Sequence, residues 1–297
     1  MQLTNRVEVT DGLPVWRRQV SIAHMNVGIE CEESGCVQGI TDLTVLFPAS
    51  HQSAPDMLFS IKPSAGMLQL TLDDELLWQG KDAGEVVAAF EYEFYNRVIG
   101  ALYPPLISLH ASTVNINGTC ITCAGISGAG KSSLCTVALL AGATYFSDEF
   151  TLLDAAGHIV PFPRPLQWGS EKHPAFSHES MLASGLFNNA FYCFPDRNGN
   201  TVTSLIWHPE HLAHAPEPMR IVLLPQYDGM AQAATLTELR RSQGIMELAA
   251  HVHHNLPPDE RIRLLHTRIA DHAVFYRLVF SDVHAAWQQI EMLTGST

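Results

Sequence analysis

Positive charge is scarce in this chain, and the scarcity excludes one class of partner. The 297 residues include 17 Lys and Arg against 30 Asp and Glu, for a formal net charge of −13. Because a nucleic-acid surface needs a basic stripe, we do not expect nucleic acid as a partner. Between Ile99 and Leu239 the basic residues are Lys131, Arg164, Lys172, Arg197 and Arg220.

Long apolar runs are also lacking. No stretch of about 18 consecutive apolar residues is present, so we expect no transmembrane helix and no membrane partner. Residues 1–6 do not have the apolar centre of a signal peptide, and we therefore expect a cytoplasmic protein. The chain has only six cysteines. In a reducing compartment they do not predict a disulfide framework, and we interpret Cys120 and Cys123 as small buried side chains.

A glycine-rich stretch between an expected strand (119–124) and an expected helix is the most informative motif. Residues 125–132, GISGAGKS, fit the phosphate-binding pattern G-x-x-x-x-G-K-[ST] without a gap. Glycines let successive backbone N–H groups turn toward one anion, and the helix N-terminus adds positive partial charge. We expect Lys131 to reach the β- and γ-phosphates of a nucleotide, and the Ser132 hydroxyl to hold Mg²⁺. The residues expected to bind the cofactor are Gly125, Ser127, Gly128, Ala129, Gly130, Lys131, Ser132 and Ser133.

Two acidic residues lie at the end of the next expected strand, 143–150. Ligands of open α/β sheets bind at the carboxyl ends of strands, so we expect Asp148 and Glu149 to face the phosphates. A carboxylate there can hold Mg²⁺ or take a proton from an attacking hydroxyl. Among the few cations, we expect Arg164 to lie near the transferred phosphoryl group, with Lys172 and Arg197 as weaker candidates. The alternatives stay open: a solvated acidic turn, and ordinary surface cations.

The N-terminal third of the chain is expected to form a small β-rich domain, residues 1–100. Proline and glycine punctuate its short apolar runs, which predict strands at 20–29, 43–47, 57–61 and 67–72. Apolar residues at helical spacing predict a helix over 82–102 that leads into the next domain.

Residues 101–297 are expected to form an α/β core in which strands and helices alternate. A strand at 110–116, an Asn-Gly turn and a return strand lead into the glycine-rich stretch. Residues 169–200 show no periodicity and predict loops. The later expected elements are a strand at 220–224 ended by Pro225, a helix from Thr237 to about 254, a helix at 259–270, a strand at 274–280 and a helix capped by Asp282. We interpret the histidines at 208–214 and 251–254 as structural or surface residues.

Several of these features together resemble the HPr kinase/phosphorylase family. The resemblance rests on His110 in a strand, the Asn-Gly turn, the 125–132 stretch and Asp148 on the following strand. The stretches 275–278 (FYRL), 281–282 (SD) and 161–165 (PFPRP) resemble the HPr-kinase-related kinases of the "A" subgroup. The resemblance covers about residues 100–297.

The resemblance implies a P-loop kinase core of the HPr kinase and phosphoenolpyruvate carboxykinase type, preceded by the small β-rich domain. It also implies an ATP-dependent serine kinase. By this analogy His110 lies by the phosphates, and Asp148 is both the base and a metal neighbour. Glu149 stands where the HPr kinases have Asp, and the segment that engages HPr is not recognisable.

We therefore expect ATP and Mg²⁺ as cofactors and a serine or threonine of a peptide or small carrier protein as the acceptor. Two alternatives remain. One is a small-molecule kinase, although those normally begin with the phosphate-binding motif. The other is a catalytically inactive nucleotide-binding regulator or scaffold. A homo-oligomer is compatible with the sequence.

Overall fold

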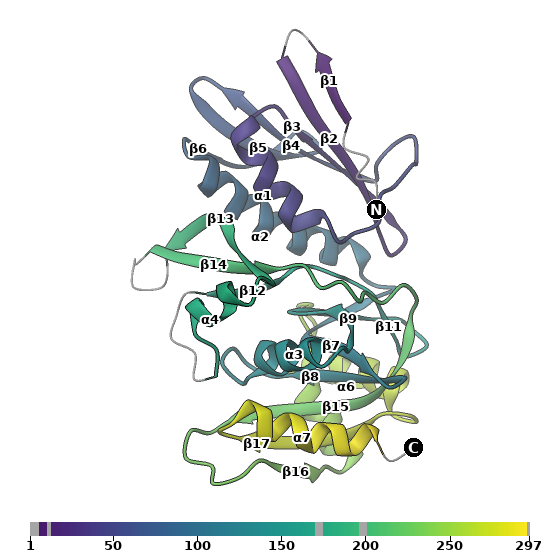
Figure 1. Ribbon diagram of the computed structural model, residues 1–297. Helices are drawn as coiled ribbons and strands as arrows, with labels where there is room; N and C mark the ends of the chain where they lie inside the picture. The colour runs from purple at the N-terminus through teal and green to yellow at the C-terminus, as the bar shows by residue number, and fades with distance from the viewer. Residues whose placement is uncertain (1–5, 11–12, 170–174, 196–200, 296–297) are drawn as a thin grey trace. The chain divides into compact units, whose positions relative to one another are not determined.

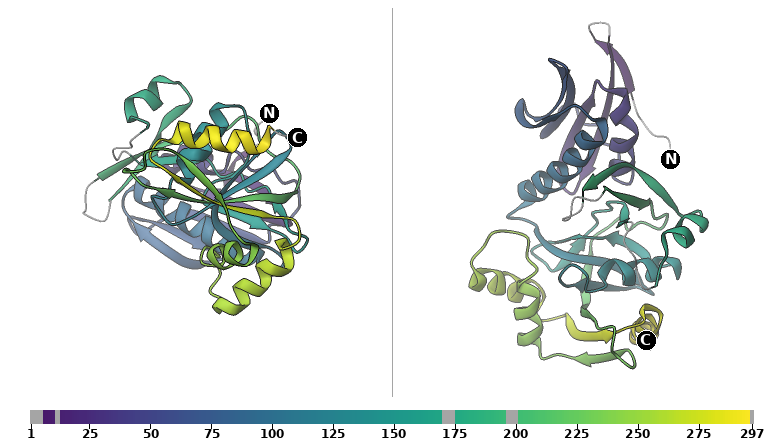
Figure 2. Two further views of the ribbon diagram at one scale, coloured as in Figure 1. Left: turned by 90° about the horizontal axis from the view of Figure 1, so that it is seen from below. Right: turned by 90° about the vertical axis from the view of Figure 1, so that its left-hand side faces the viewer.

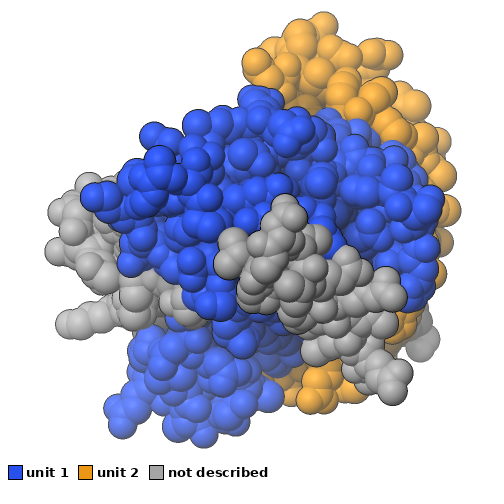
Figure 3. Space-filling view, turned by 90° about the horizontal axis from the view of Figure 1, so that it is seen from above, with its two compact units in different colours: residues 1–102, 164–208 blue, residues 103–163, 209–297 orange. Residues whose placement is uncertain are grey.

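The strands and helices of the computed structural model group into two units, each assembled from separate segments of the chain. The structure describes residues 6–10, 13–169, 175–195 and 201–295. The first unit comprises Met1–Leu102 and Arg164–His208, and the second comprises Tyr103–Pro163 and Pro209–Thr297 (Figures 1 and 3). The chain contains both helices and strands, and the strands form several sheets, which confirms the expected α/β class. The sequence did not indicate that residues 164–208 pack with the N-terminal segment.

A six-stranded sheet forms the base of the first unit, with its strands in chain order. Its strands are β1 (Arg6–Thr10), β2 (Leu13–Ile22), β3 (Met25–Cys31), β4 (Met57–Ser64), β5 (Met67–Leu72) and β6 (Glu75–Gly80). β3 and β4 are parallel because α1 (Ser34–Thr44) connects them, whereas the other neighbours are antiparallel. The predicted strand at 67–72 is confirmed.

Aromatic side chains fill the core of this unit. α2 (Ala83–Leu102) carries Phe90 and Phe94, whose ring centroids lie 5.2 Å apart, on its buried face. Phe59 of β4 packs edge-on against Phe90 at 5.7 Å, and Phe47 lies 6.1 Å from Phe94. The helix predicted over 82–102 is therefore confirmed, and its aromatic stripe is core packing.

Two predictions in this segment are wrong. The expected single strand at 20–29 is a hairpin, because the chain turns at Ala23, whose φ is 53°, between β2 and β3. The expected strand at 43–47 begins inside α1, where Cys36, Ile40 and Leu43 are buried at helical spacing. Glu33 caps that helix, because its side chain accepts a hydrogen bond from the N–H of Gly35.

The described residues of 164–208 contain regular structure, including part of 169–200, where loops were predicted. β12 (Leu166–Gly169), β14 (Thr201–Trp207) and β13 (Phe187–Pro195) form a three-stranded antiparallel sheet, and α4 (His178–Ala183) precedes β13. β13 contacts α1 and α2. The sequence did not predict these strands, because their stability depends on pairing and packing with residues distant in the chain. The apolar pattern of a short stretch carries no information about such contacts.

The second unit is built on an eight-stranded mixed sheet. β7 (Ile107–Ile116) and β8 (Thr119–Ala124) form the predicted Asn-Gly hairpin, with φ of 50° at Asn117 and 80° at Gly118. β8, β15 (Glu217–Tyr227) and β17 (Val274–Phe280) run parallel, and β16 (Thr235–Glu238) is antiparallel to β17. On the other edge of β7 lie β9 (Thr144–Ser147) and β10 (Phe150–Leu153), followed by β11 (His158–Val160).

Helices cover both faces of this sheet (Figure 2). α3 (Lys131–Leu140) and α7 (Val283–Thr294) pack together on one face. On the other face lie α5 (Arg241–Ala249) and α6 (Pro258–Ile269), over a core that includes Leu109, Val222 and Phe275. The expected cap of the last helix is confirmed, since the Asp282 carboxylate accepts from the N–H of Ala285.

Three local predictions in this unit need correction. The predicted strand at 143–150 is two strands, β9 and β10, joined at Asp148 and Glu149. Pro225 does not end β15, which continues to pair with β17 as far as Tyr227. The last residue of β15 that pairs with β8 is Leu223. Pro225 lies beyond it, so its missing N–H does not interrupt the hydrogen bonds between β15 and β8. Thr237 lies in β16 opposite Arg277, and the helix begins only at Arg241.

Candidate functional site

The glycine loop, residues 125–130, joins the carboxyl end of β8 to the first residue of α3. Gly128 and Gly130 have φ of 83° and 100°, a backbone conformation that side chains other than glycine rarely adopt. A Cβ on Gly130 would also lie 2.6 Å from Cζ of Phe280, so the loop packs closely on β17. The sequence therefore folds here as expected, as a turn with two glycines of positive φ that leads from a strand directly into a helix.

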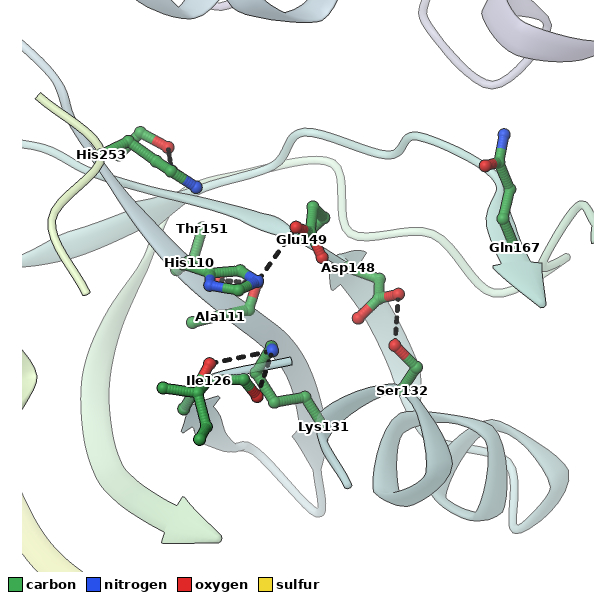
Figure 4. A network of polar contacts seen from close by, with 12 residues as sticks. His110, Ala111, Ile126, Lys131, Ser132, Asp148, Glu149, Thr151, Gln167 and His253 are labelled. Atoms are coloured by element: carbon green, nitrogen blue, oxygen red, sulfur yellow. Dashed lines mark hydrogen bonds and ion pairs between the residues drawn. The ribbon is translucent and has the colours of Figure 1, made fainter. Parts of the chain in front are cut away.

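Lys131 lies over this loop with its side chain folded inward. It is 6% exposed, and its Nζ donates to the carbonyl oxygens of Gly125, at 2.9 Å, and Ile126, at 3.2 Å (Figure 4). Burial lowers the pKa of Lys131, while the nearby carboxylates of Glu149 and Asp148 oppose that shift. The ammonium group thus sits among main-chain oxygens at the place where an anion bound by the loop would need a cation.

The Ser132 hydroxyl and the Asp148 carboxylate face each other at the start of α3. Ser132 Oγ donates to Oδ2 of Asp148 at 2.9 Å, and Asp148 is 6% exposed (Figure 4). Asp148 follows β9 directly, and β9 is held by antiparallel pairing to β7. A hydroxyl and a carboxylate oxygen at this separation are the kind of ligand set that Mg²⁺ prefers.

His110 and Glu149 form a second polar pair beside the first. Nε2 of His110 lies 2.9 Å from Oε1 of Glu149 (Figure 4). His110 stands opposite Phe150 in the β7–β10 register, which places it next to the Asp148–Glu149 connection. Glu149 has a φ of 73°, an unusual value for a side chain of its size. Strained backbone of this kind is concentrated at functional sites.

Sequence reasoning missed the histidines that follow α5 as neighbours of this site. The ring centroids of His251 and His253 lie 6.5 Å and 5.6 Å from that of His110. Burial, with His110 nearby, lowers the pKa of His251 and lowers that of His253 to about 4. Ser108 Oγ lies 2.9 Å from Nδ1 of His253. Nothing local signals this placement, because it depends on backbone bonds such as His110 N–H to His251 O, at 2.7 Å.

A cavity of about 420 Å³ adjoins residues 125–129 of the glycine loop. Its remaining walls come from the end of β15, from β17 and from α5. In it, Nη2 of Arg277 donates to both carboxylate oxygens of Glu247, at 2.5 Å and 2.6 Å. The residues that line it are Ala124, Gly125, Ile126, Ser127, Gly128, Ala129, Leu224, Pro225, Gln226, Tyr227, Glu247, His251 and Arg277.

The remaining predicted site residues divide between the two units. Ala129 and Ser133 are buried in the second unit, in the loop and in α3. Arg164 belongs to the first unit, where Nη2 lies 3.1 Å from Oε1 of Glu91 and the guanidinium lies over the Tyr95 ring. Its place near a phosphoryl group therefore stays a prediction. Lys172 and Arg197 lie outside the described residues.

The cysteine pair in β8 is confirmed as buried. Cys120 and Cys123 are free thiols, and burial raises the pKa of Cys123 to about 12. Within the described ranges, no group of three or more His, Cys, Asp or Glu side chains is arranged to hold a metal ion. An Mg²⁺ site would therefore need ligands from a bound phosphate in addition to Ser132 and Asp148.

Comparison of the chain with models of protein families, and with curated protein sequences, found no match. Among the helices of the described residues, none is both long enough and apolar enough to cross a bilayer.

Proposed function

We propose that this protein is an ATP-dependent kinase of the HPr kinase-like type, which phosphorylates a serine or threonine of a peptide or small carrier protein. The observation that carries the proposal is the contact between Ser132 and Asp148 at the mouth of the glycine loop. It brings a buried carboxylate to the place where the far end of a loop-bound triphosphate would lie. The P-loop kinase core and the resemblance to the "A" subgroup belong to the same proposal.

The residues of the loop fit a triphosphate and its metal. Gly128 and Gly130 keep the backbone open to an anion, and Lys131 provides a buried cation beside it. Ser132 and Asp148 would hold Mg²⁺, with Glu149 as a further carboxylate close by. Bound Mg²⁺ would supply charge neutralisation on the phosphate oxygens.

Asp148 is the residue we assign to accept the proton of the attacking hydroxyl. As the bond from that oxygen to the γ-phosphorus forms, the bond from the γ-phosphorus to the bridging oxygen breaks, and ADP leaves with the electron pair. Lys131 stabilises the charge on the phosphate oxygens. His110 fixes Glu149 through their 2.9 Å contact, and Arg164 is proposed to steady the transferred group.

The test is a transfer assay with ATP labelled at the γ-phosphate, Mg²⁺, and peptides or small carrier proteins encoded beside the gene. Label on the serine or threonine of a peptide or protein supports the proposal. Label on a small metabolite would instead identify a small-molecule kinase. Tight ATP binding without transfer to any acceptor would identify a regulator or scaffold. The Asp148→Asn protein is the negative control in each reaction.

A further inference from the structure

The cavity beside the glycine loop is separated from the Ser132–Asp148 contact by the order of the strands. β8, which leads into the loop, has β7 with β9 on one side and β15 with β17 on the other. Asp148 follows β9, whereas the cavity is lined by the carboxyl end of β15 and by Arg277 of β17. The loop residues in its wall are 125–129, and neither Lys131 nor Ser132 lines it.

From this arrangement we propose that the cavity receives the nucleoside of the phosphoryl donor. The inference rests on the proposed function, because it assumes that the γ-phosphate lies at Ser132 and Asp148. A triphosphate laid along the loop with that end fixed has its other end beside residues 125–129, at the entrance to the cavity. Ligands of α/β sheets collect at the carboxyl ends of parallel strands, which is where this cavity lies.

The size and walls of the cavity suit a flat heteroaromatic base. Its volume of about 420 Å³ is within the range of small-molecule sites, roughly 300–1,000 Å³. Leu224 and Pro225 supply apolar surface, and Tyr227 adds a ring that is 40% exposed. Phe280 supports that ring from behind, with centroids 6.0 Å apart. When a base stacks on such a ring, the base and the ring each remove one apolar face from water.

Arg277 and Glu247 supply the polar contacts that would orient the nucleoside. Both bonds to Glu247 come from Nη2, so the ion pair holds the guanidinium plane in place while its Nε and Nη1 hydrogens bond to no other described residue. Those hydrogens suit the acceptor nitrogens of a base, and the Glu247 carboxylate suits ribose hydroxyls. We assign Arg277, Glu247 and Tyr227 as residues that determine donor specificity.

The experiment compares the binding of Mg·ATP with that of magnesium tripolyphosphate, which has the phosphate chain without a nucleoside, by calorimetry. For the wild-type protein we expect ATP to bind at least tenfold more tightly than tripolyphosphate. Tyr227→Ala and Arg277→Ala should each weaken ATP binding about tenfold or more, and leave tripolyphosphate affinity within about twofold. Tyr227→Phe should retain most of the ATP affinity, because the ring is kept.

Arg263→Ala is the matched control, since Arg263 is 71% exposed, pairs with Glu260 at 3.8 Å within α6 and does not line the cavity. It should change neither affinity. Retained tripolyphosphate binding also shows that Arg277→Ala has not unfolded the site. The inference fails if ATP binds no more tightly than tripolyphosphate, or if the variants weaken both ligands equally or neither. It also fails if they raise only the KM of the acceptor. If the wild-type protein binds neither compound, the proposed function itself fails.

Discussion

The Ser132 hydroxyl and the Asp148 carboxylate are hydrogen-bonded at 2.9 Å across a separation of 16 residues. Ser132 lies in the first turn of α3, and Asp148 directly follows β9. Two regular elements therefore hold the hydroxyl and the carboxylate in contact. If the proposed kinase activity is correct, removing the charge of Asp148 should stop the chemistry and spare binding.

Asp148→Asn should reduce phosphoryl transfer by roughly 10²–10⁴-fold, because the amide cannot accept the proton of the hydroxyl. Nucleotide affinity, measured by calorimetry, should change little, since the amide oxygen still accepts from Ser132. Asp154→Asn is the control, because Asp154 lies in the turn after β10, where its carboxylate accepts from the N–H groups of Ala156 and His158 and pairs with the His158 ring. If nucleotide binding is lost together with transfer, Asp148 acts mainly as a metal ligand or a structural residue.

Lys131→Met should weaken nucleotide binding by about 10- to 100-fold, because a charge-assisted contact to phosphate is lost. The nucleotide-free protein should unfold at the same temperature as the wild type or higher, since a buried ammonium is costly to desolvate. Lys62→Met, at a partly exposed lysine of β4, is the control. Unchanged nucleotide affinity would remove Lys131 from the site.

Gly130→Ala should destabilise the protein by about 1–3 kcal/mol through its φ of 100° and by more through the clash with Phe280. Gly128→Ala should cost less, about 1–2 kcal/mol, since it has the positive φ but no atom within 4 Å of the new Cβ. Gly100→Ala, at an exposed position near the end of α2, should instead stabilise by up to about 1 kcal/mol. Urea denaturation measures all three, and an equal cost at 128 and 130 would argue against tight packing on Phe280.

Stability should fall in acid through His253, whose pKa is lowered to about 4 by burial and by His110. Between that value and its ordinary value of about 6.5, the unfolded chain binds a proton that the folded protein does not. The stability that His253 contributes is therefore fully present above about pH 6.5 and is lost as the pH falls toward 4. The lowered pKa values of His251 and His254 act in the same direction.

The measurement is the free energy of unfolding at several pH values for the wild type and for His253→Gln. The substitution should flatten the curve between pH 4 and 6.5. His24→Gln, which removes an exposed histidine from the β2–β3 turn, should leave the curve unchanged. A slope in His253→Gln as steep as that of the wild type would show that other groups cause the acid sensitivity.

Arg164→Ala tests whether that cation does more than pair with Glu91. Loss of a partner from this mostly buried ion pair should lower stability by about 3 kcal/mol. If Arg164 also contacts the transferred group, kcat should fall about 100-fold or more, with nucleotide affinity unchanged. Glu91→Gln breaks the ion pair while keeping the arginine, and should affect stability alone. An unchanged kcat in folded Arg164→Ala protein would restrict the residue to a structural role.

The sequence predicted those parts of the site that depend on short-range signals. The strand at 119–124, the glycine loop and the following helix are encoded in one continuous stretch, and β5 and β17 were bounded correctly by their apolar patterns. Asp148 could be predicted as a site residue because only one helix and one short strand separate it from the glycine loop.

What escaped prediction depends on contacts between distant residues. His251 and His253 reach His110 only because the chain after α5 pairs with β7, at Leu109 and Val252. Arg277 and Glu247 meet across two elements that only the tertiary fold brings together. The strands at 166–169, 187–195 and 201–207 show no regular apolar pattern, and they form through pairing with one another and through packing of β13 on α1 and α2.

Residues 164–208 belong to the first unit although they lie between two segments of the second, and this affects how the protein can be truncated. The backbone passes from one unit to the other at 102–103, at 163–164 and again at 208–209. A fragment beginning at residue 101 would retain β13 but lack the two helices on which that strand rests. Recombinant halves cut at that point would each expose apolar surface, so a working truncation would need 164–208 excised and its ends rejoined by a short linker.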